Sequence, residues 1–303
     1  MINELAFAFS ITGPVLILMM LGYSVRRMGL IDRQFISQAN SLIYNIALPV
    51  MLFFSISSQP LHDAIDVTLT LVGLIGTFLL VGVLLLISRL VPVDQRGVFV
   101  QGSYRGNLAI LGVALAVATY GSQVLPLVAV YIAVITTAYN VLAVWVLNSS
   151  GALRQIARNP LIIGILCGIV VSLIKLPIPQ VLQTSGVYIS GMTLPVALIC
   201  IGASIDLNSL GRNSRLITLA VLFKLIVSPI LLVLAGLYFG LRGTSLGVLF
   251  FLAGAPTASA SYIMARQLTS HGKLAAEIVA VTTALGVISY TAGLALLRSQ
   301  GLI

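Results

Sequence analysis

Long apolar stretches alternate along the chain with short polar connections. Most of these stretches hold the roughly 17–25 residues that a membrane-spanning helix requires. No long polar domain interrupts them, so we expect an all-α polytopic membrane protein with ten transmembrane helices. The predicted spans are residues 5–25, 36–57, 65–90, 97–119, 123–147, 160–176, 181–205, 216–239, 244–265 and 276–297.

Composition agrees with an integral membrane protein. Hydrophobic residues form 59% of the 303 and charged residues only 8%, whereas soluble domains carry about 25% charged residues. The formal net charge of +9 does not indicate a nucleic-acid partner, because the basic residues stand singly or in pairs between apolar stretches. Cys167 and Cys200 lie inside predicted spans and are interpreted as packing residues.

Basic residues set the predicted orientation, because loops on the cytoplasmic side are enriched in Lys and Arg. We expect both termini outside and the inner membrane of a cell as the location, with the first apolar stretch retained, since no cleavage site is evident. The outer connections then hold only Lys175, Arg242 and Arg298. The inner connections hold Arg26, Arg27, Arg33, Arg89, Arg96, Arg154, Arg158, Arg212, Arg215, Arg266 and Lys273.

An internal repeat divides the chain into residues 1–148 and 149–303. A shift of 146 residues aligns Pro14 with Pro160 and Gly22 with Gly168, and also aligns Leu48-Pro49-Val50 with Leu194-Pro195-Val196. Each half holds five predicted spans, an odd number, so the halves must have opposite orientations in the membrane. A 5+5 inverted repeat of this kind is typical of secondary transporters.

Two spans in corresponding positions are predicted to break. Span 4 carries Arg105, Gly106 and Asn107 near mid-membrane, and with a shift of 150 Asn107 meets Thr257 of span 9. Pro256 should interrupt span 9, because proline lacks the N–H donor and clashes with the preceding turn. Broken helices in two inverted halves point to a transporter's central site, and half-helices beginning near Asn107 and Thr257 would favour an anion there. The alternative interpretation is structural, since glycine and proline also serve close helix packing in membranes.

Charge and polarity inside the spans supply further candidates. Arg105 lies about 15 Å from the nearest hydrophilic edge, and a charge at that depth costs at least ~2.5 kcal/mol. Lys224 lies about eight residues into span 8, where it either lines the substrate path or extends toward the cytoplasmic edge. Asn45, before Pro49, is expected to mark a scaffold kink or to reach the cavity, and Asp206 to anchor the end of a helix.

Enzymatic motifs are absent from the sequence. Both histidines, His62 and His271, fall in connections, and neither a zinc-binding His-Glu-x-x-His nor a nucleotide-binding Gly-x4-Gly-Lys motif occurs. We therefore expect no catalysis, cofactor or metal. None of the seven acidic residues is expected in a span interior, which argues against proton coupling through a buried carboxylate. Asn, Ser and Thr oxygens leave sodium coupling open, and a channel or uniporter is the alternative to a carrier.

Several ordered motifs resemble the auxin efflux carrier family of permeases, which includes malonate transporters, over essentially the whole chain. They are Gly22-Tyr23, Asn45-Ile46-Ala47-Leu48-Pro49, Gly202-Ala203-Ser204 with Asp206, Lys224-Leu225-Ile226-Val227-Ser228-Pro229 and Ala255-Pro256-Thr257-Ala258.

The resemblance implies an antiporter- or bile-acid-transporter-like fold in which spans 4 and 9 cross. Spans 1, 2, 6 and 7 would form a scaffold, and spans 3–5 and 8–10 a mobile unit. It also implies carboxylate substrates at the crossing and homodimers. Relatives often carry a proline near the span-4 break, where this chain has Gly106 preceded by Arg105.

These observations predict a secondary transporter for a small organic anion, a mono- or dicarboxylate. Arg105 is the predicted charge partner, and hydrogen bonds come from Asn107, Thr257 and Ser259. The full set of predicted substrate-binding residues is Arg105, Gly106, Asn107, Pro256, Thr257, Ser259, Asn45 and Lys224.

Overall fold

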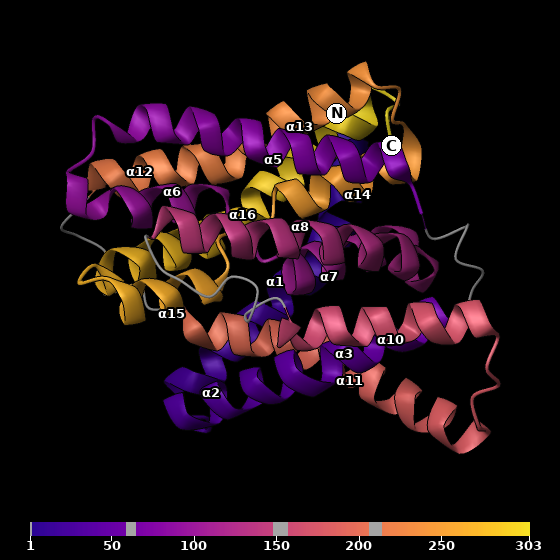
Figure 1. The fold of residues 1–303 in the computed structure, drawn as a ribbon. Coiled ribbons are helices and arrows are strands. Elements are labelled where there is room, and N and C mark those ends of the chain that lie inside the picture. The colour runs from indigo at the N-terminus through magenta and orange to yellow at the C-terminus, as the bar shows by residue number, and fades with distance from the viewer. Residues whose placement is uncertain (1, 59–64, 148–156, 206–213) are drawn as a thin grey trace.

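The computed structural model of the chain describes residues 2–58, 65–147, 157–205 and 214–303 (Figure 1). Within these ranges all regular structure is helical, apart from one antiparallel bridge between Gly106 and Thr257. The predicted all-α polytopic class is therefore confirmed. The α-helices are α1 (Ile2–Arg27), α2 (Arg33–Leu42), α3 (Leu48–Ser57), α5 (Val67–Ser88), α6 (Arg96–Tyr104), α7 (Val113–Tyr120), α8 (Leu125–Val146), α10 (Pro160–Ile174), α11 (Gln180–Ser204), α12 (Ser214–Leu222), α13 (Ser228–Tyr238), α14 (Gly243–Ala253), α15 (Ser259–Leu268) and α16 (Gly272–Ser299).

Short irregular turns join some of these helices into longer rods. Three π-helical turns, Ile43–Ala47, Leu108–Gly112 and Phe223–Val227, precede α3, α7 and α13, respectively. Two 3₁₀ turns, Val93–Gln95 and Ser122–Val124, precede α6 and α8. The kink expected at Pro49 takes the form of the first π-helical turn, whereas α11 continues through Pro195.

Helices occupy all ten predicted spans. Seven described stretches are long and apolar enough to cross a membrane, and the other three regions contain shorter apolar helices, Leu108–Tyr120, Pro160–Ile174 and Gly243–Ala253. Large apolar side chains such as Ile17, Leu86 and Val181 are exposed on the outside of the bundle, as expected for a surface that faces lipid. Ten crossings in a 5+5 arrangement remain a prediction.

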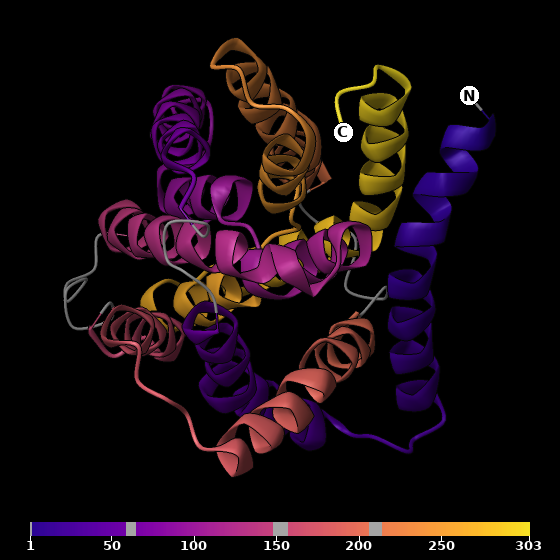
Figure 2. The same ribbon diagram turned by 90° about the vertical axis from the view of Figure 1, so that its right-hand side faces the viewer.

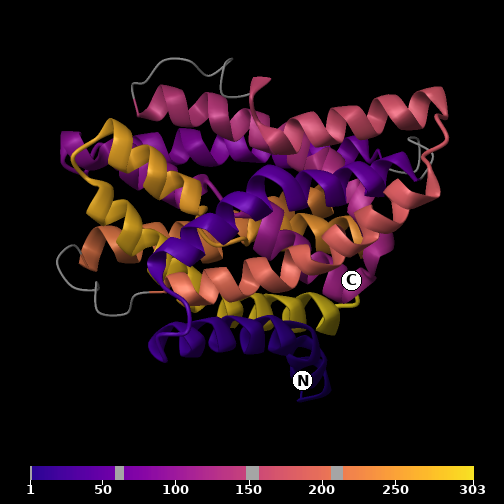
Figure 3. The same cartoon turned by 90° about the horizontal axis from the view of Figure 1, so that it is seen from below.

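The helices lie side by side in two groups, with both termini at the same end of the bundle (Figures 1 and 3). One group holds α5–α8 and α12–α16, and the other holds α2, α3, α10 and α11 (Figure 1). Helix α1 packs against α11 of the second group and against α16 of the first, and it runs along one edge of the bundle (Figure 2).

Glycines allow the helices of two pairs, α1–α11 and α3–α10, to approach each other closely. Gly22 of α1 lies directly against the backbone of Ile199 in α11. In the pair α3–α10, a Cβ atom added at Gly168 would lie 2.9 Å from the Phe53 carbonyl oxygen. Adding 146 to Gly22 gives Gly168, and subtracting 146 from Ile199 gives Phe53, so the offset of the sequence repeat exchanges the two contacts. Small residues at such positions let membrane helices pack backbone to backbone.

Candidate functional site

The two predicted helix breaks lie at the centre of the first group of helices. Helix α6 ends at Tyr104, and the π-helical turn that leads into α7 begins at Leu108. Helix α14 ends at Ala253, and α15 begins at Ser259. Both interruptions contain residues that cannot easily continue a helix, glycine in the first and proline in the second.

The two interrupted segments pair with each other in an antiparallel manner. The backbone N–H of Asn107 donates to the Pro256 carbonyl at 2.7 Å, and that of Ala258 donates to the Arg105 carbonyl at 2.9 Å. The two bonds are related by an offset of 151 residues, because Asn107 corresponds to Ala258 as the donor and Arg105 corresponds to Pro256 as the acceptor. The pairing therefore matches Asn107 with Ala258, one residue beyond the correspondence with Thr257 that sequence comparison predicted.

Side chains from elsewhere satisfy the carbonyl groups at the two helix ends that meet here. The Thr257 hydroxyl donates to the Gly102 carbonyl of α6 at 2.6 Å. At the end of α14, the Ala253 carbonyl accepts from Lys224 Nζ at 2.7 Å and from the Ser228 hydroxyl at 3.3 Å. The last carbonyls of a helix otherwise lack partners, so these bonds make the interruptions tolerable at membrane depth.

The helix beginnings contribute the opposite polarity. The N-terminal ends of the turn at Leu108 and of α15 both start at the paired segments. The first N–H groups of a helix have no partner within it and carry partial positive charge. Two positive helix ends therefore border the paired segments. The carbonyl ends of α6 and α14, which meet the same segments, are already hydrogen-bonded to side chains.

Within the described residues, Arg105 is held by neutral groups of α8 and α15 rather than by an acidic residue. Its Nη2 donates to Asn140 Oδ1 at 2.9 Å, and its Nη1 contacts the Tyr139 carbonyl at 3.4 Å and Met264 Sδ at 3.5 Å. The side chain is only 7% exposed. All three partners are neutral, so they orient the guanidinium without cancelling its charge.

Lys224 lies behind the paired segments and is fully buried. Of the two alternatives left open for Lys224, extension toward the cytoplasmic edge is wrong, because its ammonium group lies at the paired segments and donates to the Ala253 carbonyl. A place on the substrate path remains a prediction. A Cβ atom added at Gly106 would lie 3.1 Å from Lys224 Nζ. The π-helical turn that carries Lys224 is produced by Pro229, and the Leu225 carbonyl that proline leaves free accepts from the Ser289 hydroxyl at 2.6 Å.

The remaining predicted residues differ in how available they are. In the described part of the chain, the side chains of half-buried Asn107 and exposed Ser259 have no hydrogen-bond partner. The Thr257 hydroxyl already donates to the Gly102 carbonyl, and the backbone N–H of Thr257 donates to the Thr282 hydroxyl at 3.1 Å. Asn45 is exposed on another rod, and its amide donates to the Ser41 carbonyl at 2.8 Å.

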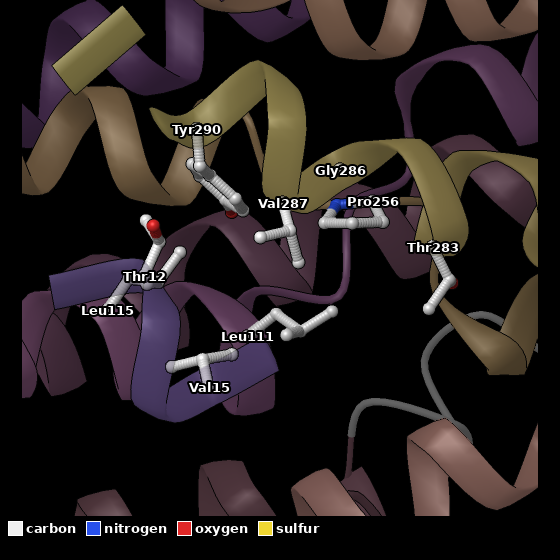
Figure 4. Close-up of a pocket in the computed structure, with 9 residues that line it drawn as sticks. All are labelled: Thr12, Val15, Leu111, Leu115, Pro256, Thr283, Gly286, Val287 and Tyr290. Atoms are coloured by element: carbon white, nitrogen blue, oxygen red, sulfur yellow. The ribbon is translucent and has the colours of Figure 1, made fainter. Parts of the chain in front are cut away.

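A narrow apolar crevice borders the second break (Figure 4). In this view the Pro256 ring lies against Gly286 of α16, with Val287 next to it and Tyr290 beyond Val287. A Cβ atom added at Gly286 would lie 2.5 Å from Pro256 Cγ. The crevice is lined by Thr12, Val15, Leu111, Leu115, Pro256, Thr283, Gly286, Val287 and Tyr290.

A larger cleft separates the two groups of helices. It has a volume of about 650 Å³ and lies between α3 and α11 on one side and α7 and α8 on the other. Its lining is mixed, with serine and glutamine side chains among apolar ones. The lining residues are Met51, Phe54, Ser55, Ser58, Val117, Ser122, Leu125, Gln183, Val187, Ser190, Gly191, Leu194 and Pro195.

Sequence reasoning missed several polar residues. Asn140 and Tyr139, which hold Arg105, looked like ordinary residues of an apolar span. The expectation that the chain offers no buried carboxylate is wrong, because Glu277, near the beginning of α16, is only 2% exposed. Its place inside the predicted span 276–297 was the available signal. Asp206, the predicted helix-end anchor, and the inner-loop residues Arg154 and Arg212 lie outside the described residues.

Comparison with known proteins places this architecture in a family. The family model described as "Membrane transport protein" matches residues 9–152 and 143–292. A Rhizobium meliloti protein described as a putative malonate transporter is 27% identical, over 96% of this chain and 97% of that protein. An uncharacterized transporter of Methanothermobacter thermautotrophicus is 23% identical over 91% of this chain and 93% of its own length.

A plant relative matches a shorter region. Auxin efflux carrier component 6 of Arabidopsis thaliana is 28% identical over 132 residues, which cover 42% of this chain and 23% of the plant protein. The family model and these relatives agree with the motifs noted in the sequence. The chain therefore belongs to the membrane transport protein family, to which the auxin efflux carriers belong.

Proposed function

We propose that the protein is a secondary transporter that moves a small organic anion, a mono- or dicarboxylate, by alternating access. The observation that carries the proposal is the pairing of residues 105–107 with residues 256–258 beside two buried cations. Among the described residues, neither Arg105 nor Lys224 forms an ion pair. Two uncompensated positive charges and two positive helix ends create a potential that favours a bound anion.

The proposed architecture is ten spans in a 5+5 inverted repeat. The paired contacts Gly22–Ile199 and Gly168–Phe53 support it, as does the reciprocal hydrogen bonding of the two breaks. In this proposal residues 1–148 and 149–303 form the two repeats. Helices α1, α2, α3, α10 and α11 act as the scaffold, and α5–α8 with α12–α16 move against it.

Each candidate residue has a proposed role at the crossing. The free N–H groups of Arg105 bind a carboxylate oxygen, and Asn107 and Ser259 donate hydrogen bonds to it. Gly106 and Pro256 keep the two backbones in contact, and Thr257 fixes the end of α6. Lys224 adds positive charge from its position at the end of α14, without touching the anion. Asn45 contacts the anion from the scaffold side.

The cleft between α3, α7, α8 and α11 is the proposed entry route. Ser58, Ser122 and Gln183, which line it, lie at the ends of their helices that the distribution of Lys and Arg assigns to the outer side. This orientation puts both termini outside the inner membrane. A homodimer, which the family resemblance implies, would place the scaffold helices at the interface.

Malonate is the first substrate to test, because one relative carries the description "Putative malonate transporter". The purified protein is reconstituted into liposomes preloaded with unlabelled malonate, pyruvate, succinate or chloride, and uptake of labelled malonate is measured. The proposal expects saturable uptake that internal carboxylate accelerates. Uptake that rises linearly with concentration, follows voltage and ignores internal carboxylate would instead establish the alternative, an anion-selective channel.

A further inference from the structure

Three buried polar oxygens lie where α6, α15 and α16 meet. They are Oε1 of Gln101, the hydroxyl oxygen of Ser261 and Oε1 of Glu277, and none has a hydrogen-bond partner among the described residues. The three side chains are 1%, 2% and 2% exposed. Buried polar groups are almost always bonded, so three orphaned oxygens on adjoining helices require an explanation.

Contacts between the helices bring the three residues into one region. Gln101 Nε2 contacts Met264 Sδ at 3.5 Å, and Ser261 lies one turn before Met264 on the same face of α15. A Cβ atom added at Gly102 would lie 3.0 Å from Ile278 Cγ2, and Glu277 directly precedes Ile278. The Gln101 side chain therefore contacts α15, and Gly102, the next residue, packs against α16 beside Glu277.

Among the described residues, no basic side chain forms an ion pair with Glu277. Arg215 of α12, which packs against α6 and α16, is exposed. On α15, Arg266 is exposed and donates to the Tyr262 hydroxyl. On α16, Lys273 is exposed, and on the neighbouring rod the Lys224 ammonium is bound to the Ala253 carbonyl. Arg105 of the α6 end donates to Asn140. An isolated buried carboxylate is costly, so a positive partner is needed.

We propose that Gln101, Ser261 and Glu277 bind a sodium ion. An amide, a hydroxyl and a carboxylate oxygen are the neutral and anionic oxygen ligands that hard cations take in proteins. One carboxylate supplies a single negative charge, which suits a monovalent ion better than calcium or magnesium. Within the described ranges, moreover, no group of three His, Cys, Asp or Glu side chains could hold a metal ion.

The site is linked to the crossing through hydrogen bonds. The Gly102 carbonyl, next to Gln101, accepts from the Thr257 hydroxyl, and the Thr257 N–H donates to Thr282. The Thr282 hydroxyl in turn donates to the Ile278 carbonyl at 2.7 Å, next to Glu277. Sodium that holds α6, α15 and α16 together thus also fixes Thr257. On the basis of the proposed function, sodium is the coupling ion, and it raises the affinity for the anion reciprocally.

Sodium binding is tested without any organic anion, so its outcome is independent of the transport proposal. The thermal unfolding midpoint of the purified protein is measured in NaCl, KCl and choline chloride at equal ionic strength and pH. A ligand that binds only the folded state raises this midpoint with concentration. Sodium is expected to do so saturably and choline not at all. Equal midpoints in all three salts would overturn the proposal, as would stabilisation that follows pH but not sodium, which indicates a proton on Glu277.

Variants assign the effect to these oxygens. Glu277→Gln should abolish the sodium response, and Ser261→Ala should weaken the apparent affinity by at least about tenfold, within the range for lost metal-site interactions. Ser55→Ala, which removes another buried hydroxyl without a partner, should keep the wild-type response. If Glu277→Gln does not fold, the assignment is tested by comparing ²²Na⁺ equilibrium binding of Ser261→Ala with that of Ser55→Ala. An unchanged response in Ser261→Ala contradicts the assignment.

Discussion

The two breaks share one backbone geometry but differ in what surrounds them. At the second break, Ala255, Pro256, Thr257 and Ala258 are all buried, and Lys224, Thr282 and Gly286 close around them. At the first break, Arg105 keeps an uncancelled charge and Asn107 a side chain without a partner in the described part of the chain. Residues of the protein thus surround the second break and bond its polar groups. The first break presents a charge and a polar side chain that a ligand can bind.

The two buried cations differ in the same way. Lys224 places its charge on a helix carbonyl end, where a cation is stabilised by the helix dipole. Arg105 is oriented by an amide and a backbone carbonyl, and a guanidinium has five N–H donors, of which these partners use only part. Lysine therefore serves the fold first, and arginine is the better candidate for direct contact with an anion.

The largest effect is expected from Arg105→Gln. A hydrogen bond to a charged group contributes about 1.5–3 kcal/mol, which corresponds to roughly 10- to 150-fold in affinity. Counterflow of carboxylate in liposomes should fall by at least that factor. The unfolding midpoint should change little, because the lost bond to Asn140 is offset by removal of a buried charge that is costly at this depth. Arg27→Gln, at the end of α1, is the matched control and should transport normally. Normal transport by Arg105→Gln would remove the difference between the breaks.

Gly286→Ala should weaken the second break specifically. Its added Cβ atom would lie 2.5 Å from Pro256 Cγ, and overpacking of this kind costs about 1–3 kcal/mol. The unfolding midpoint should fall clearly. Gly82→Ala adds the same atom to α5 where nothing lies within 4 Å. It should leave the midpoint unchanged or raise it slightly, because alanine favours a helix more than glycine does. Equal midpoints for the two variants would show that Pro256 is not held as described.

Lys224→Met should reduce transport by less than Arg105→Gln does. It removes charge behind the crossing and leaves the Ala253 carbonyl with only the Ser228 hydroxyl. We expect a loss of several-fold, measured as the initial rate of counterflow. Lys273→Met removes an exposed lysine from α16 and should have no effect. A larger loss in Lys224→Met than in Arg105→Gln would reverse the roles assigned to the two cations.

The smallest effect is expected from Thr257→Val. It removes the hydroxyl that bonds the Gly102 carbonyl at 2.6 Å, and one such bond contributes about 1 kcal/mol. The unfolding midpoint should fall slightly, and transport should persist at a reduced rate. Thr137→Val, whose hydroxyl bonds a carbonyl of its own helix, provides the comparison. An identical midpoint in both variants would argue against the hydrogen bond that links Thr257 to the end of α6.

Sequence pattern predicted the helices and both breaks well, because these depend on apolar length and on the backbone chemistry of glycine and proline. The same pattern predicts that Arg105, Asn107 and Pro256 lie in one region. The sequence alignment has an offset of 150 at this point, whereas the hydrogen bonds of the pairing have an offset of 151. Matching residue types between two segments does not determine which backbone groups bond.

Side-chain direction was the weaker part of the sequence prediction. The sequence leaves two directions open for Lys224, because position along a helix indicates depth but not which neighbour the side chain faces. Its true direction is set by Ala253, 29 residues later in the chain. Glu277 was overlooked for the same reason, because its burial depends on α6 and α15 packing over the beginning of α16.

The central claim is that Arg105 at the first break binds a carboxylate. The most direct test is the unfolding midpoint of purified wild-type protein and Arg105→Gln, titrated with acetate, pyruvate, malonate and succinate against chloride at equal ionic strength. At least one carboxylate should raise the wild-type midpoint saturably and should leave that of Arg105→Gln unchanged. Stabilisation of both proteins at the same concentrations, or of neither by any of the four, would contradict the claim.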